Sequence, residues 1–133
     1  MKIAQFAKSY QAVAVTTASP GNLVLMLFDG ALRFLSTAEH AFQGEEIFKR
    51  YEDIHNNLIK TQRILRELQC SLDLKAGGEF ATRMYALYEF MIEELRKANM
   101  AKGPGPIQTV SRLLGEIRDA WGKMLEQSQS QAA

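Results

Sequence analysis

Apolar residues recur at steps of three and four along four stretches of the chain, and helix-breaking residues separate these stretches. The first stretch has the clearest start, because Ser19 can cap a helix and Pro20 suits the first helical position. A helix with this spacing has one apolar face, which must be covered by another element. The sequence therefore predicts an all-α protein. The predicted helices cover residues 20–43, 45–72, 79–101 and 106–126.

The connections between these helices are short. Gly44 ends the first helix, Gly77 and Gly78 close the second linker, and the segment 102–106, rich in glycine and proline, interrupts the chain before the last helix. Short connections place consecutive helices side by side and antiparallel. We therefore expect an antiparallel up-down four-helix bundle over residues 19–126.

The apolar stripes define the predicted core. On the second helix the stripe runs from Ile47 through Tyr51 to Leu72, and on the third it runs from Phe80 to Ala98. The first helix is apolar over more than one stripe, so it should be the most buried of the four.

The two ends of the chain differ from the bundle. Residues 1–18 carry Ile3, Phe6 and Tyr10 at steps of three and four, but the segment is too short to be a stable isolated helix. We predict an N-terminal arm or short helix docked on the bundle, which is either a displaceable cover or a permanent part of the core through Tyr10. The polar residues 127–133 predict a flexible tail.

Composition excludes several functional classes. A chain of 133 residues with 47% hydrophobic residues matches one domain, and its net charge of +1 is scattered, which disfavours nucleic acid as a partner. The longest apolar run, residues 23–28, is too short to insert across a bilayer. A single cysteine, Cys70, forms no intramolecular disulfide, and residues 1–15 do not resemble a secretory signal. We expect a cytoplasmic protein that is a monomer or weak dimer.

The catalytic patterns in the sequence are weak. Glu52 and His55 have the spacing of half of a di-metal site in a helical bundle, but His40, the other histidine, has Thr37 three residues before it. Cys70 has no histidine that the sequence places beside it. We therefore expect no enzymatic activity, no cofactor and no metal.

Several short motifs carry a family resemblance over about residues 10 to 125. The motifs are Tyr10-Gln11, residues 17–20, residues 23–31, Phe34-Leu35, Ser71-Leu72-Asp73, Gly77-Gly78-Glu79, residues 87–91, Ala98-Asn99 and residues 118–121. Their order and spacing resemble those of the FliS-type flagellar secretion chaperones. Two features depart from the family pattern: Phe28 stands where many relatives have tyrosine, and the segment 102–106 is unusually rich in glycine and proline.

The resemblance implies a cytosolic bundle that binds the C-terminal segment of flagellin, which is disordered when free. Such binding prevents premature filament polymerisation and helps delivery to the membrane export gate of the flagellar type III secretion apparatus. An adaptor or dimerising bundle with a different helical client shares the same compositional features, and a flagellin peptide distinguishes the two.

Surplus apolar residues beside the core stripes suggest a groove for the partner. Each such residue taken alone is more often core or ordinary surface. Together with the N-terminal residues Ile3, Phe6 and Tyr10 they form the predicted partner-binding set. The others are Phe48, Ile59 and Ile64 on the second helix and Tyr85, Tyr88 and Ile92 on the third.

Overall fold

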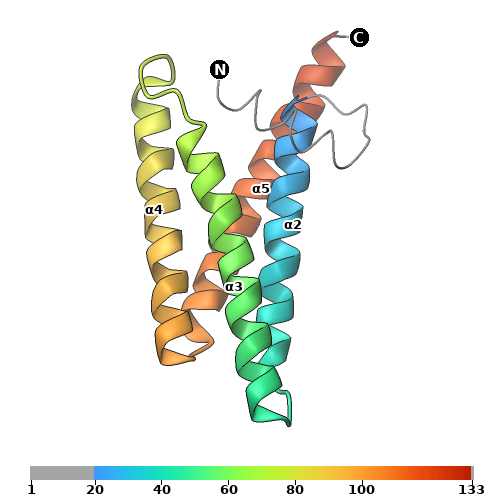
Figure 1. Ribbon diagram of the computed structural model, residues 1–133. Coiled ribbons are helices and arrows are strands. Elements are labelled where there is room, and N and C mark those ends of the chain that lie inside the picture. The colour runs from blue at the N-terminus through green and yellow to red at the C-terminus, as the bar shows by residue number, and fades with distance from the viewer. Residues whose placement is uncertain (1–19, 133) are drawn as a thin grey trace.

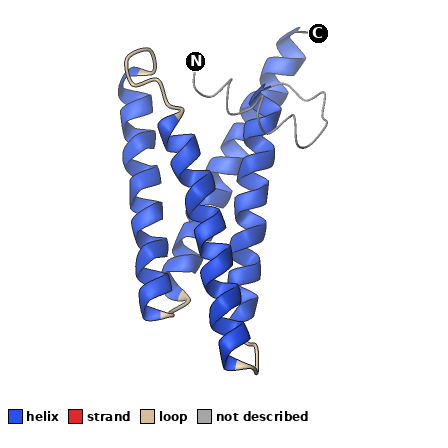
Figure 2. Ribbon diagram, in the orientation of Figure 1, coloured by secondary structure: helices blue, strands red, loops and turns tan. Residues whose placement is uncertain are grey.

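The computed structural model describes residues 20–132, with side chains to residue 128. Within this range all regular structure is helical and the helices pack against one another, which confirms the predicted all-α four-helix bundle (Figure 2). The N-terminal arm predicted for residues 1–18 lies outside the described residues. The four helices, labelled as in Figure 1, are α2 (Pro20–Ala41), α3 (Ile47–Cys70), α4 (Gly78–Ala101) and α5 (Gly105–Ala132).

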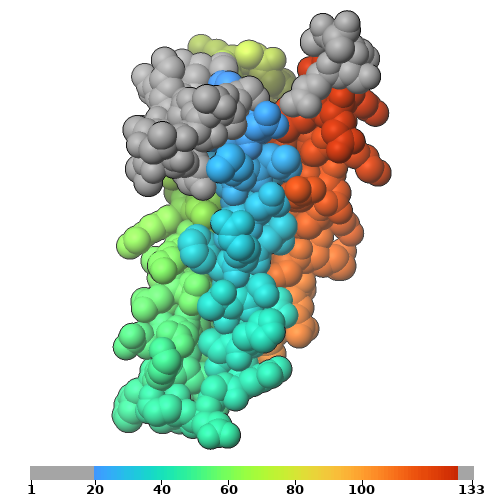
Figure 3. Space-filling model, turned by 90° about the vertical axis from the view of Figure 1, so that its right-hand side faces the viewer, coloured from blue at the N-terminus to red at the C-terminus, as the bar shows by residue number. Residues whose placement is uncertain are grey.

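Consecutive helices run antiparallel (Figure 1). Helix α3 packs on both α2 and α4, and α5 closes the bundle by packing on α2 and α4. Figure 3 shows α2 between α3 and α5 on one face of the molecule. Helix α5 runs obliquely, from the end of α4 toward the beginning of α2. As a result α4 and α5 are close at one end of the bundle and separate at the other, which we call the cavity end.

Capping explains two of the helix boundaries. The Glu46 carboxylate accepts hydrogen bonds from the backbone N–H groups of Phe48 and Lys49, so α3 begins at Ile47 and not at residue 45. Helix α4 ends at Lys102, which adopts the left-handed conformation and donates its backbone N–H to the carbonyl of Ala98.

The C-terminal helix is longer than predicted. Helix α5 begins at Gly105 and continues to Ala132, through most of the segment expected to be a tail. The polar residues after position 126 include no glycine or proline. Because nothing in this segment breaks a helix, the hydrogen-bond ladder continues past the last core contact.

The core follows the predicted stripes in the middle of each helix but not at the ends. Ile47, Tyr51 and Phe80, all predicted in the core, are exposed. The first turns of α3 extend beyond the helices that cover the rest of its stripe, and the start of α4 lies where α5 has diverged. The side chains buried on α4 are Ala81, Tyr88, Met91, Ile92, Leu95 and Ala98.

Candidate partner-binding site

An apolar cavity of about 480 Å³ lies at the cavity end of the bundle. All four described helices contribute to it, and the α3–α4 linker completes one side. Ser71 and Asp73 are the polar residues among side chains that are otherwise apolar or aromatic. The described lining residues are Val24, Phe28, Leu68, Ser71, Leu72, Asp73, Gly77, Phe80, Ala81, Met84, Tyr88, Ile117, Ala120, Trp121 and Met124.

The divergence of α4 and α5 creates this cavity. Helix α4 supplies one wall and α5 the opposite wall, while buried residues of α2 and α3 form the floor. Two of the lining side chains are strongly exposed, with Phe80 of α4 at 67% and Met124 of α5 at 45% of their full accessibility. The cavity therefore has an apolar rim as well as an apolar interior.

Trp121 fixes the α5 wall. Its indole N–H donates to the backbone carbonyl oxygen of Gly21 at 2.9 Å, and its ring packs edge-on against Phe28 with centroids 6.3 Å apart. Both contacts reach α2, so the side chain is oriented by a polar and an aromatic partner.

Tyr88 contributes to the α4 wall. It is 4% exposed, and burial raises the pKa of its phenol well above the ordinary value of 10.0. The phenol therefore stays neutral, and the ring adds to the apolar surface of the cavity.

The structure distributes the predicted binding residues over several environments. Tyr88 lines the cavity, and both Tyr88 and Ile92 belong to the buried core, although they were expected beside it. Ile64 packs partly buried against that core, and Ile59 is half-buried. Phe48 and Tyr85 are exposed. Tyr88 and Ile92 are buried because the core-facing side of α4 is rotated from the predicted stripe toward them.

These residues are spread over much of the length of the α3–α4 pair. Phe48 lies in the first turn of α3, whereas the backbone carbonyl of Tyr85 accepts a hydrogen bond from Gln69 near the end of α3. The rise of an α-helix separates Phe48 and Gln69 by about 30 Å. The predicted N-terminal members Ile3, Phe6 and Tyr10 lie outside the described residues.

The rim residues were missed as binding candidates because Phe80, Trp121 and Met124 continue the regular apolar stripes. Their period is the same as that of buried residues, so the pattern assigns them to the core. The one available signal was their place near the helix ends, where a partner helix can be absent.

His55 and Cys70, which the sequence offered as weak metal and nucleophile candidates, do not line the cavity. The Nδ1 atom of His55 lies 2.9 Å from the side-chain nitrogen of Asn99, in a contact between α3 and α4. Among the described residues, no group of three or more histidine, cysteine or acidic side chains is placed to hold a metal ion. Cys70 is exposed.

In the described part of the chain, no helix has the length and apolar character needed to span a membrane.

Comparison with known proteins identifies the family. Residues 2–128 match the family described as Flagellar protein FliS. The chain belongs to the FliS family. The match includes every described residue that lines the cavity, so the cavity lies within the FliS domain.

Relatives named flagellar secretion chaperone FliS are similar to this chain over most of their length. The flagellar secretion chaperone FliS of Bacillus subtilis is 34% identical over 118 residues, covering 89% of this chain and 84% of the relative. The flagellar secretion chaperone FliS of Salmonella typhimurium is 36% identical over 115 residues, covering 81% and 78%. That of Vibrio cholerae is 30% identical over 121 residues, covering 88% and 86%.

Proposed function

We propose that this FliS-family chain is a cytosolic flagellar secretion chaperone that binds the C-terminal segment of flagellin. Binding keeps flagellin from polymerising prematurely and aids its delivery to the membrane export gate. The names of the relatives support the chaperone role, and the cavity with its exposed apolar rim is the observation that carries the binding role. The proposed chaperone acts as a monomer or weak dimer, without catalysis or a cofactor.

The cavity suits a segment that folds as it binds. A disordered chain must offset its loss of conformational entropy by burying apolar surface, and a helix does so by inserting side chains of one face into a groove. Ligand pockets that bury several apolar groups commonly have volumes of roughly 300–1,000 Å³, and this cavity is within that range. We therefore propose that apolar side chains of a flagellin helix enter between α4 and α5.

The other predicted residues take secondary roles in this proposal. Phe48 and Tyr85, both exposed, provide further contacts for a segment that wraps around the bundle. Ile59 and Ile64 flank its path, and Ile92 supports the wall from the core.

Calorimetric titration of the full chain with a C-terminal flagellin fragment tests the proposal. We expect tight one-to-one binding with a large negative heat-capacity change, because apolar surface is removed from water. Absence of binding to this fragment would exclude flagellin as the client.

Two phenylalanines of α4 allow a matched test of the site. Phe80 lies on the cavity rim, whereas Phe90, exposed at 46%, is outside the cavity lining. We expect Phe80→Asp to weaken flagellin binding by about tenfold or more, which corresponds to about 1.4 kcal/mol. Phe90→Asp should bind normally, and circular dichroism should show both variants folded. Tyr88 is less suitable, because a charge at a buried position would disturb the fold.

Hydrogen exchange tests the proposed role of the N-terminal arm. If Ile3, Phe6 and Tyr10 cover the binding surface until flagellin displaces them, protection of residues 1–15 should fall when flagellin binds. Unchanged or increased protection would instead indicate that the arm completes the core permanently.

A further inference from the structure

Gln69, in the last turn of α3, is a buried polar residue that joins α3 to α4. Its side chain is 1% exposed, and its amide nitrogen donates to the carbonyl oxygen of Tyr85 at 3.1 Å and to Oε2 of Glu89 at 2.9 Å. Its amide oxygen accepts from Nη1 of Arg66 at 2.5 Å. Both amide hydrogens and the oxygen are therefore satisfied.

Arg66 closes this network. It lies one turn before Gln69 on α3, and its Nη1 also donates to Oε2 of Glu89 at 2.7 Å. Two side chains of α3 therefore bind the same carboxylate of α4. We call Arg66, Gln69 and Glu89 the α3–α4 clamp.

The clamp lies directly beside the cavity lining. Leu68 precedes Gln69, Met84 precedes Tyr85, and Tyr88 precedes Glu89, and the first residue of each pair lines the cavity. Movement of the first half of α4 away from α3 would therefore displace Met84 and Tyr88 from their places in the cavity wall.

Few buried apolar side chains hold the first half of α4 against α3. Between Gly78 and Leu87, the only buried side chain of α4 is that of Ala81, which is a single methyl group, while Met84 and Leu87 pack partly buried against the core. A buried amide adds a restraint here, because movement of α4 away from α3 would leave its hydrogen-bonding groups unpaired and out of water.

We propose that Gln69 is a positioning residue, which holds the first half of α4 against α3 and so maintains the cavity in the shape that accepts the partner. This role rests on the proposed function of the cavity. Arg66 and Glu89 act through Gln69, by orienting its amide.

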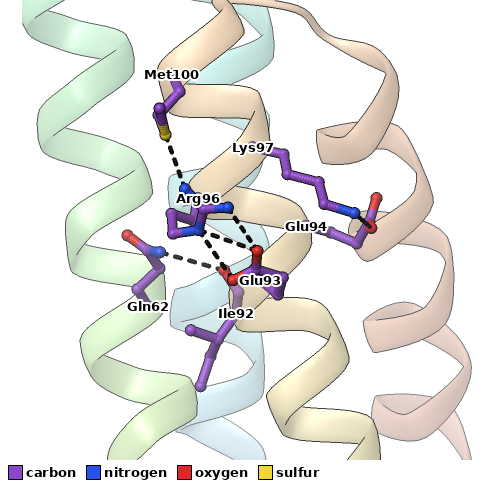
Figure 4. A network of polar contacts seen from close by, with 7 residues as sticks. All are labelled: Gln62, Ile92, Glu93, Glu94, Arg96, Lys97 and Met100. Atoms are coloured by element: carbon purple, nitrogen blue, oxygen red, sulfur yellow. Dashed lines mark hydrogen bonds and ion pairs between the residues drawn. The ribbon is translucent and has the colours of Figure 1, made fainter.

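Gln62 supplies the control. It lies two turns before Gln69 on the same side of α3 and donates to the carbonyl oxygen of Ile92 at 3.2 Å (Figure 4). This second glutamine contact joins the same helices, but α4 has a full set of buried residues here, including Met91, Ile92 and Leu95. Packing holds α4 against α3 at this position, so the loss of the hydrogen bond should leave the cavity unchanged.

The test compares Gln69→Met with Gln62→Met in the full chain. Methionine has a volume similar to that of glutamine and lacks its hydrogen bonds. Trp121, the single tryptophan, lines the cavity and reports on its hydration. We expect Gln69→Met to shift the tryptophan emission to longer wavelength and to raise the Kd for the flagellin fragment by about tenfold. Gln62→Met should change neither.

Two substitutions of Glu89 test the positioning role even if Gln69→Met fails to fold. Glu89→Gln keeps an oxygen that accepts from the Gln69 amide and should retain the normal emission and Kd, whereas Glu89→Leu should behave as expected for Gln69→Met. The proposal is overturned if Glu89→Leu leaves emission and Kd unchanged, or if Gln62→Met causes an equal loss.

The two proposals fail separately. If the wild-type chain does not bind the flagellin fragment, the proposed function is wrong. An emission shift in Gln69→Met and Glu89→Leu, absent in Gln62→Met, would still support the positioning role.

Discussion

The indole N–H of Trp121 donates to the carbonyl oxygen of Gly21 at 2.9 Å, which ties the far part of α5 to the first turn of α2. The carbonyl oxygens in the first turn of a helix already accept hydrogen bonds from the backbone N–H groups four residues later. The oxygen of Gly21 therefore has two donors, one within α2 and the other the indole of Trp121. The bond holds α5 on α2 beside the cavity, where α5 has separated from α4. It therefore contributes both to stability and to the position of the cavity wall.

Replacement of Trp121 by phenylalanine should lower the free energy of unfolding by about 1–2 kcal/mol, because the hydrogen bond is lost and the smaller ring packs less fully. Urea unfolding followed by circular dichroism measures this change. Met124→Leu, at an exposed position one turn on, should stay within about 0.5 kcal/mol of wild type. Equal midpoints for Trp121→Phe and wild type would contradict the structural role of the bond.

A second contact between α5 and α2 is ionic. Arg118 donates from Nε to Oδ1 of Asp29 at 2.7 Å and from Nη2 to Oδ2 at 3.4 Å, and the carboxylate raises the pKa of the guanidinium. Both side chains are about one-third exposed, so solvent and salt screen the pair. We expect Arg118→Gln to lower the urea midpoint at low salt, with a smaller difference at about 1 M salt.

The pair formed by Arg112 and Glu116 is the control for this measurement. It lies within α5, and its two side chains are 65% and 66% exposed. Arg112→Gln should leave the midpoint nearly unchanged at either salt concentration. A salt-independent effect of Arg118→Gln would indicate that its aliphatic packing, and not the ion pair, stabilises the fold.

The two glycines at the start of α4 are required for different reasons. A Cβ on Gly77 would lie 2.5 Å from the Cβ of Ala81 and 2.8 Å from the carbonyl oxygen of Asp73, whereas Gly78 has φ of +57°. We expect alanine at either position to destabilise the protein by about 1–2 kcal/mol, through a clash at Gly77 and backbone strain at Gly78. Thermal unfolding measures both changes.

Gly103→Ala is the matched substitution in the next linker. A Cβ there would meet no atom within 4 Å among the described residues, and its φ is outside the left-handed region. The melting temperature of this variant should be equal to that of wild type or slightly higher, since alanine reduces the freedom of the unfolded chain. If Gly77→Ala and Gly103→Ala melt alike, the close approach at Gly77 has no energetic consequence.

Acid should weaken the α3–α4 clamp. Hydrogen bonds from Gln69 and then from Arg66 lower the pKa of Glu89 below its ordinary value of 4.5, and the Arg66 charge acts in the same direction. A carboxyl group with a lowered folded-state pKa stabilises the fold above its unfolded pKa, and this contribution is lost as the pH falls through the folded value. We therefore expect the urea midpoint of the wild type to fall as the pH is lowered below about 4.5.

Glu89→Gln provides the comparison for this titration, because its side chain does not ionise. The fall of the urea midpoint in acid should be smaller in this variant. An identical fall in wild type and Glu89→Gln would assign the loss of stability to other carboxylates.

Local features of the sequence were sufficient to predict where the helices lie and which side chains are buried near the middle of each. Leu58, Leu65 and Leu95 continue apolar stripes in mid-helix and are fully buried, as the period predicts. Prediction was poorer at the ends, where Ile47 and Phe80 have the same period but none of the described helices covers them. An apolar stripe specifies which side chains share one face of a helix. It does not specify whether another helix packs against that face at a given position along the axis.

The sequence by itself determined the all-α class, the approximate helices and the family, because spacing, caps and breakers act over one or two turns of the chain. Only the tertiary structure decided where the candidate site lies. The cavity results from the angle at which α5 crosses the bundle, and the α4 wall beside it is joined to α3 by Gln69, a residue whose burial no local pattern indicates. Both depend on contacts between residues far apart in the chain.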